Sequence, residues 1–153
     1  MRVAKQTISL TDAVTHLLEE CRMVLPGIQA LFGFQLIAVF NSTFRENLSA
    51  VEQYLHLAAI GLIAVAVALV MAPAALHRQT NPEAATEDFV KIAGKLLLLS
   101  MFPLLLAICF DFYLIARLIL KNPSLSLLLT AGLLIVFRLT LVRTTAVATQ
   151  IRV

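Results

Sequence analysis

The residue with the clearest chemical potential is Asp111, an acid inside an apolar segment that runs from about Ile92 to Ile119. If this segment crosses a membrane, a rise of about 1.5 Å per residue from Leu96 places the carboxyl group ~22 Å from one edge. An unpaired carboxylate at that depth costs several kcal/mol. Asp111 is therefore expected either to have polar partners or to be neutral.

Polar residues at matching depth occur in other apolar segments. Gln35 falls near the middle of the first segment, and His56 lies close to the outer end of the second. With Tyr113 they form a candidate site that could titrate or coordinate a small cation, whose members are Asp111, His56, Gln35 and Tyr113. The alternative is a neutral, hydrogen-bonded Asp111 that fixes helix packing.

A second group of charged residues is expected at the opposite face of the membrane. We name it the cytoplasmic clamp, and its members are Glu19, Glu20, Arg22, His77, Arg78, Arg138 and Arg143. Mixed charge at this density predicts a network that ties the N-terminal helix to the base of the bundle, with a gate or regulatory site as the alternative. We expect Glu19 or Glu20 to contact one of the arginines from the later segments.

Recognised catalytic patterns are absent from the sequence. It contains no GxxxxGK[ST], HExxH or GxSxG pattern and no paired-cysteine metal spacing. We therefore expect no enzymatic activity, no cofactor and no metal site. Cys21 and Cys109 fall at different depths, so both are predicted to be free thiols.

The composition predicts which solvent surrounds these residues. Of 153 residues, 60% are hydrophobic and 14% are charged, and the mean hydropathy is +0.92. A soluble domain carries about 25% charged residues. Because the apolar residues come in long blocks, the chain is predicted to be a single all-α membrane domain over residues 1–153. The net charge of +3 is small and gives no sign of nucleic-acid binding.

Four apolar segments are predicted to cross the membrane, because a helix needs about 20 residues to do so. They are residues 24–40, 54–76, 92–119 and 125–142. Pro26 is expected in the first turn of the first of these helices. Polar segments separate the four, and the last separator is the turn Lys121-Asn122-Pro123.

A separate amphipathic helix is predicted over residues 9–22. Ser9-Leu10-Thr11-Asp12 resembles a capping box, and apolar residues follow at helical spacing at Val14, Leu17, Leu18 and Cys21. This helix is expected to lie on the cytoplasmic membrane surface. The alternative is a helix packed beneath the bundle.

The positive residues divide unequally between the two sides of a four-span chain. One side holds nine of them, Arg2, Lys5, Arg22, Arg78, Lys91, Lys95, Arg138, Arg143 and Arg152, and the other holds Arg45, Arg117 and Lys121. The positive-inside rule then places both termini in the cytoplasm.

Small residues form a stripe along the second apolar segment. We call this set the small-residue stripe, and it consists of Gly61, Ala64, Ala68, Ala72 and Ala75. Their helical spacing places them on one face, where backbones can approach closely. The stripe is expected to pack on another helix, within the chain or in a second subunit.

Two runs of the sequence carry a resemblance to a known family. Residues 17–36, LLEECRMVLPGIQALFGFQL, and residues 71–78, MAPAALHR, resemble signatures of the DUF6328 group, small bacterial membrane proteins of unknown function. The resemblance implies four spans, a bacterial inner-membrane location and no established activity.

Two functions fit these observations. The first is a homo-oligomeric conduit or transporter for small cations or protons, based on Asp111, the polar residues near it and the small-residue stripe. The alternative is a non-transporting scaffold or regulatory subunit of a larger membrane complex, based on the clamp and on the lack of a strong polar path.

Overall fold

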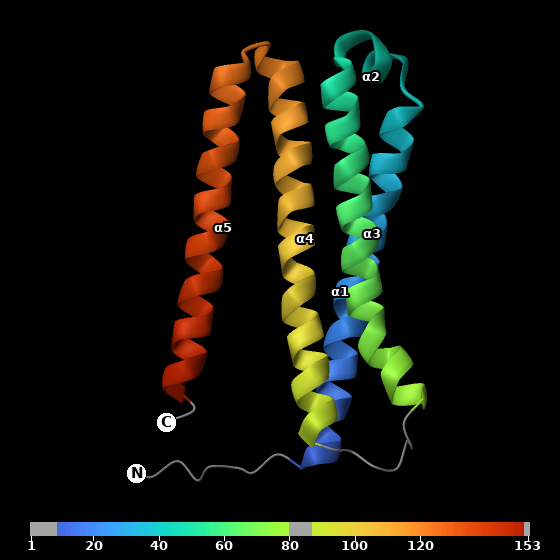
Figure 1. The fold of residues 1–153 in the computed structure, drawn as a ribbon, viewed down its shortest axis with the longest axis vertical. Coiled ribbons are helices and arrows are strands. Elements are labelled where there is room, and N and C mark those ends of the chain that lie inside the picture. The colour runs from blue at the N-terminus through green and yellow to red at the C-terminus, as the bar shows by residue number, and fades with distance from the viewer. Residues whose placement is uncertain (1–8, 80–86, 152–153) are drawn as a thin grey trace. The chain divides into compact units, whose positions relative to one another are not determined.

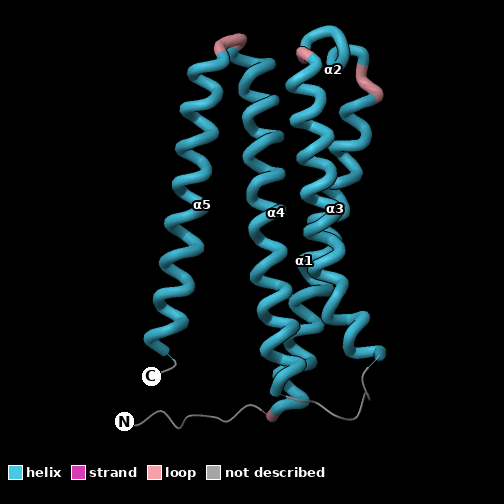
Figure 2. The backbone as a smooth tube through the Cα atoms, viewed as in Figure 1, coloured by secondary structure: helices cyan, strands magenta, loops and turns pink. Residues whose placement is uncertain are grey.

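The computed structural model describes residues 9–79 and 87–151, and within these ranges every element is an α-helix. In chain order the helices are α1 (Leu10–Val39), α2 (Ser42–Asn47), α3 (Ala50–Gln79), α4 (Glu87–Leu120) and α5 (Pro123–Ile151) (Figure 1). The connections between α1 and α2, α2 and α3, and α4 and α5 are short (Figure 2).

Four of these helices, α1, α3, α4 and α5, are long and apolar enough to cross a membrane. The predicted all-α class with four membrane-spanning helices is therefore confirmed, and the chain is a multi-pass membrane protein. The helices are longer than the predicted spans. For example, α4 has 34 residues and begins at Glu87 rather than near Ile92. Hydropathy marks only the part of a helix that lies in hydrocarbon, whereas its backbone hydrogen bonds continue into the polar flanks.

The first helix does not divide where the sequence predicts. α1 is continuous over 30 residues, so the predicted helix over residues 9–22 and the span that begins at Val24 form one element. The predicted cap is confirmed, because the Asp12 N–H donates to Ser9 Oγ at 3.2 Å and Ser9 Oγ donates to Asp12 Oδ2 at 2.6 Å. With its first turn at Ser9, α1 carries Pro26 in its interior, not at its start. The proline removes one helix hydrogen bond without ending the helix.

The Cα positions cluster into two compact units. Among the described residues, unit 1 contains α1 up to Phe34, α3 from Ile63 and α4 up to Pro103. Unit 2 contains the end of α1 from Gln35, all of α2, α3 up to Leu62, α4 from Leu104, and α5.

Unit 1 has an almost entirely apolar interior, which its three helices build at helical spacing. The buried residues are Val14, Cys21 and Ile28 from α1, Ile63, Ala66, Val70 and Pro73 from α3, and Ala93, Leu97 and Ser100 from α4. On α3 these positions do not coincide with the small-residue stripe. Ala64, Ala68 and Ala75 are exposed, so that the stripe faces away from the chain's own core.

Unit 2 includes the hairpin between α4 and α5. Lys121 adopts a φ of 51°, and Asn122 Oδ1 accepts hydrogen bonds from the Ser124 and Leu125 N–H groups at 3.1 and 3.3 Å. Asn122 therefore caps α5 and Pro123 occupies its first position, which confirms the predicted turn. Cys21 in unit 1 and Cys109 in unit 2 are both buried free thiols, as predicted.

Candidate functional site

Three of the predicted site residues meet inside unit 2. Gln35 comes from the last turns of α1, His56 from the second turn of α3, and Asp111 from α4. Gln35 is 4% exposed and His56 is 6% exposed, so this is a buried polar cluster. We call Gln35, His56 and Asp111 the polar triad.

The carboxyl group of Asp111 has a partner for each oxygen. Gln35 Nε2 donates a hydrogen bond to Asp111 Oδ2. His56 Nδ1 lies 3.5 Å from Asp111 Oδ1, with side-chain exposures of 7% for His56 and 16% for Asp111. The acid is therefore held between an amide and an imidazole, as its depth in the sequence predicts.

The other imidazole nitrogen fixes the tautomer of His56. Nε2 lies 3.0 Å from the backbone carbonyl oxygen of Gln35. A carbonyl only accepts hydrogen bonds, so Nε2 must carry a hydrogen. The protonation of Nδ1 then depends on Asp111. One shared proton can lie on Nδ1, as an imidazolium beside a carboxylate, or on Asp111, as a carboxylic acid beside a neutral imidazole.

Gln35 leaves one acceptor without a protein partner. Its Oε1 atom is buried and receives no hydrogen bond within the described part of the chain. A buried acceptor in this condition costs about 1–3 kcal/mol. Because Nε2 is committed to Asp111, Oε1 is the acceptor of Gln35 that stays unpaired.

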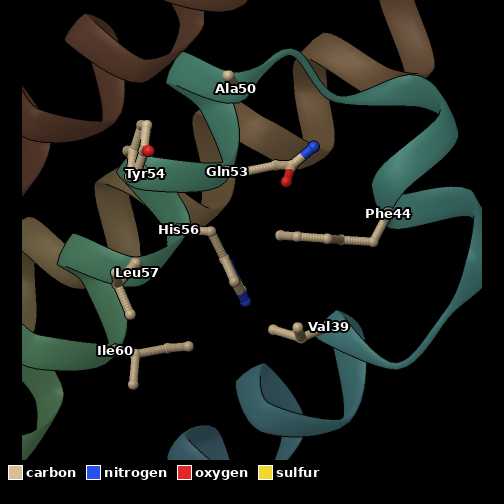
Figure 3. A pocket seen from close by; sticks show the side chains of 8 residues that line it. All are labelled: Val39, Phe44, Ala50, Gln53, Tyr54, His56, Leu57 and Ile60. Atoms are coloured by element: carbon tan, nitrogen blue, oxygen red, sulfur yellow. The ribbon is translucent and has the colours of Figure 1, made fainter.

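A pocket of about 300 Å³ reaches the triad at His56. The His56 side chain extends from α3 toward Phe44 and Val39 (Figure 3). The rings of Phe44 and His56 are 5.0 Å apart at their centroids and inclined by 60°. Gln53 and the largely exposed Tyr54 add polar groups to the pocket wall. His56 is thus in contact with both the buried acid and an open pocket.

Tyr113 does not join the triad. It is half-buried on α4 and forms no hydrogen bond with the triad in the described structure. Residues two apart on a helix do not face the same side, which separates Tyr113 from Asp111.

Of the contacts predicted for the clamp, the one between Glu19 or Glu20 and Arg78 is not formed within the described part of unit 1. Glu19 lies 3.8 Å from His16 on its own helix, and both side chains are exposed. Among the described residues of unit 1, neither Glu19 nor Glu20 forms an ion pair with Arg78. The physical reason is the helix period, which turns Glu19 to the side of α1 opposite the buried Val14 and Cys21. Arg138 and Arg143 are exposed on α5 in unit 2, and their part in the clamp stays a prediction.

An ion pair that the sequence analysis missed lies near the triad. Glu52 Oε1 is 3.3 Å from Arg117 Nε, and the side chains are 13% and 32% exposed. Glu52 Oε2 also accepts from the Ser49 N–H and hydroxyl at 2.8 and 2.7 Å. The signal was present, since Ser49-Ala-Val-Glu52 is a capping box directly before an apolar run. This pair joins α3 to α4 about one turn from His56 and roughly 9 Å along α4 from Asp111.

Comparison with known proteins identifies a family. The model of a family of unknown function (DUF6328) matches residues 8–145. No curated protein and no solved structure matches the chain.

Proposed function

The chain belongs to the DUF6328 family, whose function is unknown, and we propose that it is a proton conduit or transporter of the membrane. The observation that carries this proposal is the pair formed by the buried His56 and the partly exposed Asp111, with His56 Nδ1 3.5 Å from Asp111 Oδ1. Ionisable residues inside a membrane span are rare and mark ion or proton paths. We further propose that the protein has no enzymatic activity.

A proton fits this pair better than a metal cation. The hydrogen bond from His56 Nε2–H to the backbone carbonyl of Gln35 holds the ring with Nδ1 facing the acid. A proton held on Nδ1 can therefore pass to Asp111 Oδ1 without a rotation of the ring, which leaves a neutral imidazole with its hydrogen on Nε2. A metal ion would need more ligands, and the described residues contain no group of three or more His, Cys, Asp or Glu side chains able to hold one.

The pocket supplies an approach to the pair. Protons would enter by the side that carries Gln53 and Tyr54 and reach the ring of His56. Transport across the membrane also requires a path by which the proton leaves Asp111. We assign it to an interface between copies of the chain, because the Gly61 and Ala64 end of the small-residue stripe is exposed and suits close helix packing.

Proton flux into liposomes that contain only this protein tests the proposal. Asp111→Asn should reduce the flux to the level of protein-free liposomes, because the amide cannot release a proton. Asp88→Asn is the matched control, the same substitution at an exposed acid of α4, and it should retain the wild-type flux. Wild-type flux in an Asp111→Asn protein that inserts and assembles normally would contradict the proposal.

We also propose an orientation, with both termini in the cytoplasm of a bacterial cell and the protein in the inner membrane. The support is the distribution of Lys and Arg, of which Arg2, Lys5 and Arg152 lie outside the described residues. A C-terminal reporter should be cytoplasmic and a tag at Glu46 should be external. An externally accessible C-terminus would contradict this orientation.

A non-transporting subunit of a larger complex is the second candidate. It is favoured by α5, because only 6% of the window Pro123–Leu141 that suits a membrane span is buried in the chain. A helix this exposed is suited to pack against a partner protein. Larger proteins that co-purify in fixed ratio, together with no proton flux, would support this candidate over a conduit.

A further inference from the structure

A second pocket lies between α1 and α3 within unit 1 and has no part in the proton proposal. Its volume is about 320 Å³. The apolar part of its wall includes Leu25, Met71 and Ala74, and its polar part is made by Arg22, His77 and Arg78. Among the described residues this wall therefore carries no carboxylate, and its ionisable side chains are the three basic residues and the buried Cys21 thiol.

The two arginines of this wall have no acidic partner in the part of the chain that the structure describes. Arg22 and Arg78 are exposed, and neither forms an ion pair or a hydrogen bond within the described residues. Glu19, about one helical turn before Arg22, lies 3.8 Å from His16 instead. In contrast, Lys91 of the same unit lies 3.3 Å from Glu87. The guanidinium groups beside the pocket are therefore available to an anion.

The order of residues along each helix gives the pocket two chemically different ends. On α1, Leu25 follows Arg22 by about one turn toward the interior of the apolar segment. On α3, Ala74 and Met71 precede Arg78 by about one and two turns, again toward the apolar interior. The cationic groups thus lie at the membrane-surface end and the apolar wall extends into the membrane.

We propose that this pocket binds one anionic phospholipid. Its phosphate group would lie between Arg22 and Arg78, and an acyl chain would lie along Leu25, Met71 and Ala74. Basic pockets between membrane helices are suited to such headgroups, and guanidinium binds phosphate through two parallel hydrogen bonds.

A neighbouring groove favours a lipid over a free phosphate ion. This groove, of about 520 Å³, shares Met71, Ala74 and Arg78 with the arginine-lined pocket and continues along Ala68, Ala72 and Ala75 of the small-residue stripe. A phospholipid has two acyl chains, and two apolar grooves flank the same arginine. An inorganic phosphate would bind the arginines and leave both apolar grooves unoccupied.

The chain contains no tryptophan, which permits a direct binding measurement. Met71→Trp places a single fluorophore at the rim of both grooves, where Met71 is 51% exposed. Leu127→Trp, at a position on α5 that is 64% exposed, reports on ordinary surrounding lipid. In vesicles, brominated phosphatidylglycerol should quench the Met71→Trp reporter in clear preference to brominated phosphatidylcholine. The Leu127→Trp reporter should show little preference.

The arginines are then tested in the Met71→Trp background. Arg22→Gln or Arg78→Gln should reduce the preference for phosphatidylglycerol about 5-fold each, and the double variant about 30-fold. Arg45→Gln, an exposed arginine of α2 in unit 2, is the matched control and should leave the preference unchanged.

Three results would overturn the lipid site. They are an equal preference at both tryptophan reporters, a preference that survives the double arginine variant, and a preference that inorganic phosphate abolishes while chloride of equal ionic strength does not. If Met71→Trp does not assemble, Leu25→Trp in the same pocket replaces it as reporter. This test measures lipid quenching and not proton flux, so the lipid site and the proposed Asp111 proton site can be contradicted independently.

Discussion

The interiors of the two units differ in how they satisfy polar groups. In unit 1 the only buried polar side chain among the described residues is Ser100, whose hydroxyl donates to the Leu97 carbonyl of its own helix at 2.6 Å. In unit 2 Gln35, His56 and Ser126 are buried. Ser126 Oγ donates to the nearby Asn122 carbonyl at 2.8 Å, whereas Gln35 and His56 interact with Asp111 and with each other across α1, α3 and α4, and Gln35 Oε1 keeps no partner within the described residues. The buried polar group of unit 1 bonds within its own helix, whereas the polar triad of unit 2 depends on three helices.

This difference indicates where chemistry is expected. A serine bonded to its own helix is inexpensive in a membrane, since it demands no precise arrangement. A buried acid and imidazole are expensive, and they persist in membrane spans mainly where they serve an ion or proton path. Unit 1 keeps its charges at the surface, where they can meet lipid headgroups. Unit 2 keeps an ionisable pair inside.

The largest effect that tests this comparison is expected from His56→Gln. Glutamine retains hydrogen bonding but cannot relay a proton, so the proton flux should fall by about 100-fold, the lower range for a positioned proton-transfer group. His16→Gln, at an exposed histidine of unit 1, is the control and should leave the flux unchanged. Equal fluxes for the two variants in liposomes would remove His56 from the path.

A stability comparison of the two interiors comes next. Gln35→Leu removes the donor to Asp111 Oδ2 and leaves the acid with fewer partners. It should destabilise the protein by about 2 kcal/mol, or roughly 4–8 °C in melting temperature. Ser100→Ala in unit 1 should cost less, because the Leu97 carbonyl keeps its helix hydrogen bond. Thermal unfolding in detergent measures both, and a larger loss for Ser100→Ala would reverse the comparison.

A smaller effect is expected from the ion pair of Glu52 with Arg117, which is partly shielded from solvent. Either single glutamine substitution strands one charge and should lower the melting temperature by a few degrees. The double substitution should recover part of the loss, which gives a coupling of about 1 kcal/mol. The exposed pair of Lys91 with Glu87 in unit 1 is the control and should show almost no coupling. Additive effects at Glu52 and Arg117 would show that their proximity contributes nothing.

Much of the fold follows from the sequence because a bilayer leaves few alternatives. Long apolar runs must form helices with satisfied backbones, and the turn at Lys121-Asn122-Pro123 has residues that stop one helix and start the next. The continuity of α1 was not predicted. Charged residues at Glu19 and Glu20 reduce hydropathy but do not interrupt helix hydrogen bonds, so hydropathy alone cannot separate a span from its helical extension.

The site was partly predictable for a related reason. Depth along each helix brought Gln35, His56 and Asp111 to one level, and depth depends only on the rise per residue. Direction around the helix depends on which face packs, and that is decided by tertiary contacts. Hence depth alone could not show that Tyr113 makes no hydrogen bond with the triad, or which of its two expected partners the exposed small-residue stripe faces.

The smallest effect is expected from Glu20→Gln, at a residue for which the sequence analysis expected a structural role. Glu20 is exposed and forms no ion pair with Arg78, so its removal strands no buried charge in unit 1. The melting temperature in detergent should therefore change by less than about 2 °C, as is usual for a surface substitution. Glu52→Gln in unit 2 should lower it more, because that carboxylate has Ser49 and Arg117 as partners. A decrease for Glu20→Gln as large as for Glu52→Gln, relieved by Arg143→Gln, would establish a clamp between Glu20 and α5 after all. In that case unit 1 would also depend on a charged contact, and the contrast between the two units would be confined to their interiors.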